Sequence, residues 1–204
     1  MKYIIAGIGT EIGKTFISSI LTETLQADYW KPIQSGALDF TDTDTVKSLI
    51  SNAKTIFHPE SYRLNQPMSP HAAAAIDGVR IELSKFELPK TDNHLIVELA
   101  GGIMVPLNDR ETNIDLIRKL AIPVILISKN YLGSINHTLL SVEILKLNNI
   151  LIKGLIFNGE PNKSSEDFIL NYTKLDHLGS VNFEEIIDKN VVKIYANQFM
   201  NNFR

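Results

Sequence analysis

Short and nearly continuous hydrophobic segments recur along the chain and alternate with segments whose apolar residues have helical spacing. The hydrophobic segments cover residues 3–6, 94–98, 123–128 and 150–157, with shorter ones at 28–30 and 177–181. Strands buried on both faces are typical of parallel sheets that helices cover on both sides. The pattern therefore predicts an α/β fold with three layers (αβα), in which six or seven mostly parallel strands form the central sheet.

Apolar residues at a spacing of three and four predict helices after most of these strands. The predicted helices cover residues 16–25, the region around 46–50, a short alanine-rich segment after 70, then 82–88, 112–121, 134–148, 164–174 and a weak helical tail. Ser134 is a candidate N-cap for the long helix. The chain contains no internal repeat, linker or low-complexity segment, so we expect a single domain over residues 1–204.

The first strand leads into a glycine-bearing loop that ends in Gly13-Lys14-Thr15 and opens the first helix. Strand, loop and helix in this order form the context of a phosphate-binding loop, in which backbone N–H groups hold phosphate, the lysine adds charge and the hydroxyl can ligate Mg²⁺. The strict pattern requires glycine where this chain has Ile8, so the loop is a variant. An ordinary turn with a chance lysine is the alternative interpretation.

Three further sets of polar residues lie near the ends of predicted strands or at the start of a predicted helix. Lys31 begins the loop Lys-Pro-Ile-Gln-Ser-Gly after the second strand, and loops at this end of parallel strands line the ligand crevice. Asp42 and Asp44 precede a helix, so one of them can cap it while the other faces Mg²⁺ at Thr15. Glu98 ends a buried strand before a glycine turn, which indicates a second metal-and-phosphate position.

Composition limits the classes of function. The chain has 204 residues, 44% hydrophobic and 21% charged, which is ordinary for a soluble protein, and its net charge of −3 gives no reason to expect nucleic acid or an anionic membrane as a partner. The absence of cysteine excludes disulfides, zinc-thiolate sites and a cysteine nucleophile. No apolar segment approaches the length of a membrane span. We therefore expect a cytoplasmic protein.

Taken together, the motifs resemble those of the dethiobiotin synthetase family along nearly the whole chain. The matching segments are Gly-x-Gly-Thr-Glu-Ile-Gly-Lys-Thr at 7–15, Lys-Pro-Ile-Gln-Ser-Gly at 31–36, an aspartate that opens the next helix, Ser-Pro-His at 69–71, Glu-x-Ala-Gly-Gly at 98–102, Leu-Gly-x-Ile-Asn-His at 132–137, and Asn158. The combination of the first two segments is much more specific than a phosphate-binding loop alone.

The resemblance implies a P-loop NTPase-like fold and an ATP- and Mg²⁺-dependent ligase of biotin biosynthesis. In that family, CO₂ carboxylates one amine of 7,8-diaminononanoate to a carbamate. A carbamate oxygen then attacks the γ-phosphate of ATP, and the second amine displaces phosphate from the mixed anhydride, which closes the ureido ring of dethiobiotin. The family also implies a homodimer, with the substrate site at the interface.

The resemblance also implies roles for individual residues. Lys14, Lys31 and Thr10 would be catalytic, and Thr15, Asp44 and Glu98 would hold Mg²⁺. The nucleotide would contact a set of residues that comprises Glu11, Ile12, Gly13, Lys14, Thr15, Phe16, Asp44, Glu98, Gly101 and Asn158. The diamine or its carbamate would contact Thr10, Lys31, Ser35, Leu132, Gly133, Ser134, Ile135 and Asn136.

Some positions depart from the family pattern. These departures affect the expected contacts with adenine, and so the nucleotide selectivity, rather than the expected reaction. Leu99 stands where the family often has glycine, Gly159 replaces a common aspartate, and the segment 181–184 lacks the usual proline. The family's substrate-contacting tyrosine has no clear position here. The alternative function is a partition-type switch ATPase, whose dimerisation depends on nucleotide; such proteins carry an extra lysine early in the loop, where this chain has Gly7-Ile8-Gly9.

Overall fold

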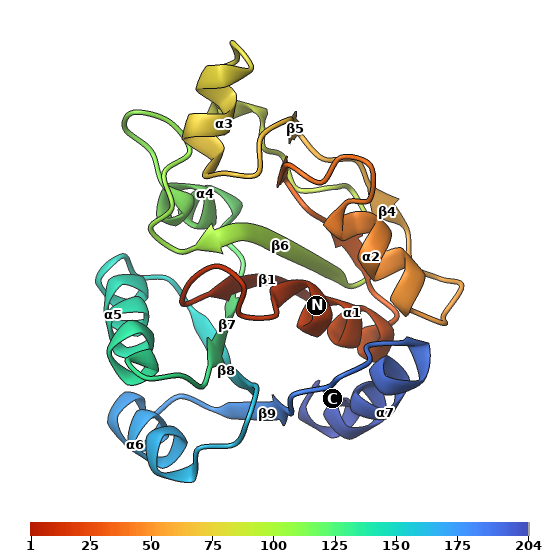
Figure 1. The fold of residues 1–204 in the computed structure, drawn as a ribbon, viewed down its shortest axis with the longest axis vertical. Helices are drawn as coiled ribbons and strands as arrows, with labels where there is room; N and C mark the ends of the chain where they lie inside the picture. The colour runs from red at the N-terminus through yellow and green to blue at the C-terminus, as the bar shows by residue number, and fades with distance from the viewer. Residues whose placement is uncertain (204) are drawn as a thin grey trace.

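The structure, a computed structural model, describes residues 1–203. Its centre is a seven-stranded sheet with the order β4-β2-β6-β1-β7-β8-β9, in which all neighbouring strands are parallel (Figure 1). The strands are β1 (Lys2–Gly7), β2 (Asp28–Trp30), β4 (Phe57–His58), β6 (Leu95–Gly102), β7 (Val124–Lys129), β8 (Ile152–Asn158) and β9 (His177–Val181). The predicted α/β class and mostly parallel sheet are confirmed.

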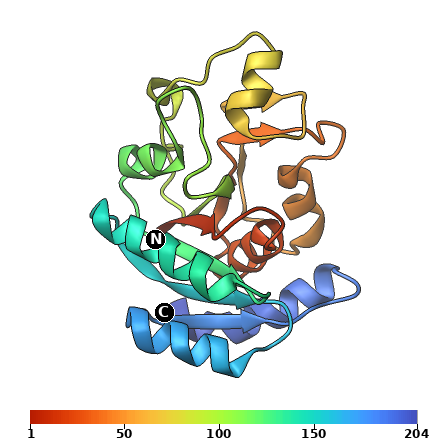
Figure 2. The ribbon, with the colours of Figure 1, turned by 60° about the vertical axis from the view of Figure 1, so that its left-hand side comes forward.

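Helices cover both faces of this sheet, which gives the three predicted layers (Figures 1 and 2). One face carries α1 (Lys14–Leu25), α2 (Asp42–Leu49) and α7 (Lys189–Phe199), and the other carries α4 (Asn113–Leu120), α5 (Ser134–Leu147) and α6 (Lys163–Thr173). Smaller elements are α3 (Pro70–Ile76) and the 3₁₀ turns η1 (Leu83–Lys85) and η2 (Met200–Phe203). Within residues 1–203, no helix is long and apolar enough to cross a membrane.

The alternation of side chains along β1 explains why its sequence is continuously apolar. Ile4 and Ala6 belong to the core on the α4–α5–α6 side, whereas Tyr3 and Ile5 belong to the core on the α1–α2–α7 side. Successive side chains of a strand point to opposite faces, and here both faces are buried. Each fully buried isoleucine contributes about 1.5–3 kcal/mol, so the two cores fix the central strand firmly.

Several local details differ from the sequence prediction. A separate two-stranded parallel sheet pairs β3 (Ile33–Ser35) with β5 (Tyr62–Leu64), and these segments and β4 were not predicted as strands. Strand β6 continues through Gly102, which pairs with Gly7, so Glu98 lies within the strand and does not end it. The N-cap of α5 is Gly133, with Ser134 as its first helical residue.

Candidate functional site

A cleft of about 660 Å³ lies at the carboxyl ends of β1, β2 and β6. This volume is in the range of small-ligand pockets, and crevices at this end of an open α/β sheet are where ligands bind. Most residues that the sequence singled out line it, namely the segment 10–16, Lys31, Ser35, Glu98 and Gly101. Residues from distant parts of the chain therefore meet in one cavity.

The loop between β1 and α1 forms one wall of the cleft and is shaped to hold an anion. Gly13 is the N-cap of α1 and has φ 87°, a conformation that glycine adopts without strain. Because glycine has no side chain to accept hydrogen bonds, the first-turn N–H groups of the helix remain free to bind phosphate. Asn158 supports the loop from β8, since its side-chain amide donates to the Ile12 carbonyl at 2.7 Å.

Lys14 begins the first helix and folds back across the loop. Its ammonium donates to the Gly9 carbonyl at 2.9 Å, and the residue is only 8% exposed. Burial lowers the pKa of Lys14 to about 8, although the neighbouring Glu98 carboxylate opposes this shift. A bound phosphate would favour the charged form of the lysine, so this group is suited to an anionic ligand.

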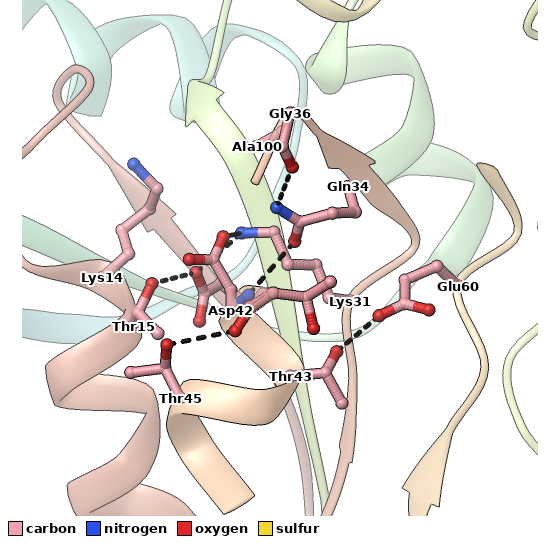
Figure 3. A network of polar contacts seen from close by, with 12 residues as sticks. Lys14, Thr15, Lys31, Gln34, Gly36, Asp42, Thr43, Thr45, Glu60 and Ala100 are labelled. Atoms are coloured by element: carbon pink, nitrogen blue, oxygen red, sulfur yellow. Dashed lines mark hydrogen bonds and ion pairs between the residues drawn. The ribbon is translucent and has the colours of Figure 1, made fainter. Parts of the chain in front are cut away.

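Lys31 enters the cleft from the end of β2, opposite the loop (Figure 3). Its ammonium donates to Oε1 of Glu98 at 2.9 Å and forms a second ion pair with Asp42. Burial alone would lower the pKa of Lys31, but the Glu98 and Asp42 carboxylates outweigh it and hold the pKa above its usual value. The side chain is therefore a buried group within the cavity that carries its charge at neutral pH.

Glu98 is the centre of the polar network beneath the cleft. Its Oε1 accepts from the Thr15 hydroxyl at 2.8 Å and from Lys31, while its Oε2 accepts from the Tyr29 hydroxyl at 2.9 Å. Burial alone would raise the pKa of Glu98, but the Lys31 charge and these hydrogen bonds keep it below its usual value. The carboxylate is therefore charged at neutral pH even though it is 1% exposed.

The prediction that Asp44 holds a metal is wrong, because this side chain caps α2. The Asp44 carboxylate accepts from the Thr41 N–H at 3.0 Å and from the Thr41 hydroxyl, while the Asp44 N–H donates to that hydroxyl. This reciprocal capping box holds Oδ2 of Asp44 against Thr41, and Asp44 does not line the cleft. Asp42, which the sequence left as the alternative, lines the cleft and pairs with Lys31.

The oxygen donors that converge here suit a hard cation such as Mg²⁺. They are the Thr15 hydroxyl and the Glu98 and Asp42 carboxylates, and the Lys31 ammonium already lies between the two acids. Within residues 1–203, no cluster of three or more histidine, aspartate or glutamate side chains could hold a metal alone. A cation at this position would need phosphate oxygens and waters as further ligands, which is how Mg²⁺ commonly binds.

Other predicted residues lie outside the lining of the cleft. Asn158 contacts the outer side of the loop through Ile12, and the segment 132–136 forms the turn that opens α5. Leu132 in that turn is fully exposed, whereas Ser134 is buried. The assigned contacts of these residues with adenine and with a substrate carboxylate stay predictions.

The loop 31–36 was predicted to line the crevice, but no role was predicted for Gln34 or for the segment 67–70. Gln34 lines the cleft and accepts from the Asp42 N–H at 3.3 Å, and the segment 67–70 closes it from outside. Gly36 has φ 70°, and a side chain there would lie 2.6 Å from Pro67, so only glycine permits this close approach. The Pro-Met-Ser-Pro sequence at 67–70 signals a loop but not its position over the cleft.

Comparison with solved structures finds proteins of the same fold. The septum site-determining protein MinD from Pyrococcus horikoshii, complexed with Mg-ADP, has a TM-score of 0.62 at 12% identity, covering 100% of this chain and 93% of that one. A ParA family ATPase from Chlorobium tepidum has a TM-score of 0.55 at 9% identity, covering 99% and 91%. At these identities the likeness establishes a shared P-loop fold and nothing further.

Comparison of sequences gives much closer relatives. Residues 1–191 match a family model described as an AAA domain. The ATP-dependent dethiobiotin synthetase BioD of Cytophaga hutchinsonii is 50% identical, covering 99% of this chain and 98% of that protein. The protein of the same name from Chlamydia felis is 46% identical, covering 97% and 93%. The identity extends over nearly the full length of both chains, and this chain belongs to the dethiobiotin synthetase family.

Proposed function

We propose that this protein synthesises dethiobiotin from 7,8-diaminononanoate, CO₂ and ATP. The observation that carries the proposal is the position of Lys31, whose buried ammonium lies in the same cleft as the phosphate-binding loop. In the proposed transfer of the γ-phosphoryl group two anions, the triphosphate and a carbamate, must approach each other. A second buried cation in the cleft would neutralise their charge as they meet.

The proposed reaction takes place in three steps. One amine of the diamine attacks CO₂ and loses a proton, which gives a carbamate. A carbamate oxygen attacks the γ-phosphorus and ADP leaves. The second amine then attacks the carbamate carbon, phosphate leaves with the bridging oxygen, and the ureido ring closes.

The groups of the cleft divide between the two substrates. The amides of residues 11–16 and Lys14 bind the phosphates, while Lys31 neutralises the carbamate and the γ-phosphate as they approach. Thr10 and Ser35 contact the diamine or its carbamate. In support of this role, the Ser35 hydroxyl is buried beside the cleft and has no hydrogen-bond partner among residues 1–203.

Mg²⁺ would be held by Thr15, Glu98 and Asp42 together with phosphate oxygens. When bound, the ion supplies positive charge that stabilises the transferring phosphoryl group. Lys31 also occupies the space between the two carboxylates, so its ammonium has to share them with the metal or move towards the substrate.

The remaining contacts involve the nucleotide and a second copy of the chain. Gly101 lines the cleft, and Asn158 at the end of β8 would contact adenine. The turn at 132–136 would receive the carboxylate of a diamine bound mainly to the partner of a homodimer. Leu132 in this turn is fully exposed, so its side chain is available for such a contact. We place the enzyme in the cytoplasm.

The assay that tests this function measures phosphate release and dethiobiotin together. We expect both to require the diamine and bicarbonate, at one phosphate per dethiobiotin. A partition-type switch ATPase shares the fold and is the alternative, and it would hydrolyse ATP at the same rate with and without the diamine. Equal rates in those two conditions would overturn the proposal.

A further inference from the structure

Strand β2 delivers two side chains to the same carboxylate. In the parallel pair of β2 and β6, Tyr29 lies opposite Ile96, and Glu98 is two residues further along β6 on the same face. Because side chains two residues apart share a face, Tyr29 and Lys31 both lie on the Glu98 side of the sheet. The intervening Trp30 points into the opposite core.

The two donors contact different oxygens of Glu98. Tyr29 donates its hydroxyl to Oε2 at 2.9 Å, whereas Lys31 donates to Oε1 at 2.9 Å, the oxygen that also accepts from Thr15. Oε2 is thereby directed into the protein and Oε1 towards the cleft. The tyrosine fixes the plane of the carboxylate and determines which oxygen a ligand in the cleft can reach.

The surroundings of Tyr29 hold its side chain in this position. Its side chain is fully buried, and its ring packs against Phe57 of β4 with ring centres 6.0 Å apart. A tyrosine hydroxyl ordinarily keeps its proton at physiological pH and so remains a donor. The only polar contact of the Tyr29 hydroxyl in the described chain is Glu98.

We propose that Tyr29 is a positioning residue for the metal site, which holds Glu98 so that Oε1 alone faces the cation and the γ-phosphate. The inference rests on the proposed Mg²⁺-dependent function. Hydrogen-bond partners behind a metal ligand orient it and tune its affinity, and their loss typically weakens metal binding about 10- to 100-fold. Tyr29 does not line the cleft, so it acts only through Glu98.

The test compares Tyr29→Phe with Tyr62→Phe. The first variant keeps the ring but removes the donor to Glu98. The second removes a hydroxyl that accepts from the Glu82 N–H, at a strand outside the cleft. Mn²⁺ binding to the complex with a non-hydrolysable ATP analogue is followed by electron paramagnetic resonance, and the Mg²⁺ dependence of turnover is measured in parallel.

For Tyr29→Phe we expect about 10-fold weaker Mn²⁺ binding and a Mg²⁺ half-saturation raised by a similar factor, with turnover largely restored at saturating Mg²⁺. Affinity for the analogue without metal should not change, and Tyr62→Phe should match the wild type throughout. A purely structural tyrosine would lower the melting temperature and leave the metal titrations of Tyr29→Phe unchanged, and that result would overturn the inference.

Two further measurements keep the inference testable. If the single variant does not fold, the double variant Tyr29→Phe/Glu98→Gln removes the buried charge that the lost donor leaves unpaired. Its Mn²⁺ affinity should equal that of Glu98→Gln alone, and an additional loss would refute action through Glu98. If wild-type turnover does not require Mg²⁺, the proposed function fails instead, which distinguishes the two failures.

Discussion

At the scale of single residues, the charge of Lys31 matters most. It is held by two carboxylates inside a cavity that also contains the phosphate-binding loop. The ion pairs keep the ammonium charged despite its burial, and they also hold it ready near the place where phosphate and carbamate would meet. Replacing Lys31 therefore separates the binding of nucleotide from phosphoryl transfer.

We expect Lys31→Ala to lower turnover about 10²- to 10³-fold, because one electrostatic contact to the transition state is lost. Nucleotide affinity, measured by calorimetry with a non-hydrolysable ATP analogue, should change little, since Lys14 and the loop amides remain. An equally large loss of nucleotide affinity would instead assign Lys31 to ground-state binding.

A pair of aspartates two residues apart provides a matched comparison. Asp42→Asn should raise the Mg²⁺ concentration needed for half-maximal turnover, because a carboxylate facing the cleft is lost. Asp44→Ala should leave the Mg²⁺ titration unchanged and lower stability by about 1 kcal/mol, the usual cost of removing a helix cap. Mg²⁺ titrations and urea unfolding of both variants check this assignment, and the reverse pattern would contradict it.

The sequence predicted most residues of the cleft and missed the distinction between these two acids. The phosphate-binding loop and Lys31 have local signatures, so their position follows from the elements on either side. The choice between Asp42 and Asp44 depends on which one faces back towards Thr41. The spacing from Thr41 to Asp44 is itself a capping-box signature and could have identified the cap.

At the scale of elements, a buried acid joins the edge of the sheet to the loop before β6. Asp28 at the start of β2 is fully buried. Its carboxylate accepts from the Thr91 hydroxyl at 2.6 Å, the Ile56 N–H at 3.0 Å and the Asn93 amide at 3.0 Å. These contacts fix the beginning of β2, the strand that carries Tyr29 and leads into Lys31, so they support the site from behind.

Asp28 predicts a pH dependence of stability. Burial opposes the charged form, but the hydrogen bonds from Thr91, Ile56 and Asn93 outweigh it and hold the pKa of Asp28 below its usual value. A lowered folded-state pKa stabilises the protein above the unfolded value of about 3.9, and this contribution is lost as the pH falls through the folded-state pKa.

We therefore expect Asp28→Asn to lower the free energy of unfolding at pH 7 by about 1.5–3 kcal/mol, the range for hydrogen bonds to a charged group. The difference from the wild type should narrow as the pH is lowered below 4. Urea unfolding at pH 7 and pH 3 measures it. A difference of the same size at both pH values would show that the charge of Asp28 contributes nothing.

The long elements could be predicted from the sequence because burial on both faces leaves a strong apolar signal. Strands β4 and β5 contain two and three residues, which is too short for any periodicity to be recognised. The continuation of β6 through Gly101 and Gly102 also has no local signal, since adjacent glycines usually indicate a turn. Pairing with β1 decides the conformation there.

At the scale of the whole molecule, all residues that line the cleft come from segments between residues 10 and 105. The turn at 132–136 lies at the start of α5 and does not line the cleft. The parallel arrangement was predictable because each of the longer strands, β1, β6, β7, β8 and β9, is followed by a helix. In the proposed homodimer, the relation between the cleft and the α5 turn depends on contacts between copies of the chain, about which a single sequence carries no direct signal.

We expect Leu132→Asp to weaken the proposed homodimer about tenfold or more, which corresponds to about 1.4 kcal/mol, and to raise the KM for the diamine. Leu151→Asp is the matched control, because Leu151 is also exposed but precedes β8 at the opposite end of the sheet. Sedimentation analysis measures the first effect and steady-state kinetics the second. If Leu132→Asp changes neither the dimer affinity nor the KM for the diamine, the turn at 132–136 belongs neither to the interface nor to the substrate site.

The fate of the carbamate oxygen tests the central claim most directly. If the carbamate attacks the γ-phosphate, one oxygen of CO₂ ends in the released phosphate. A rapid single turnover with ¹⁸O-labelled CO₂, ATP and the diamine should therefore give phosphate with one ¹⁸O atom for each dethiobiotin formed. Phosphate without the label would mean that water attacks ATP, and it would contradict the account.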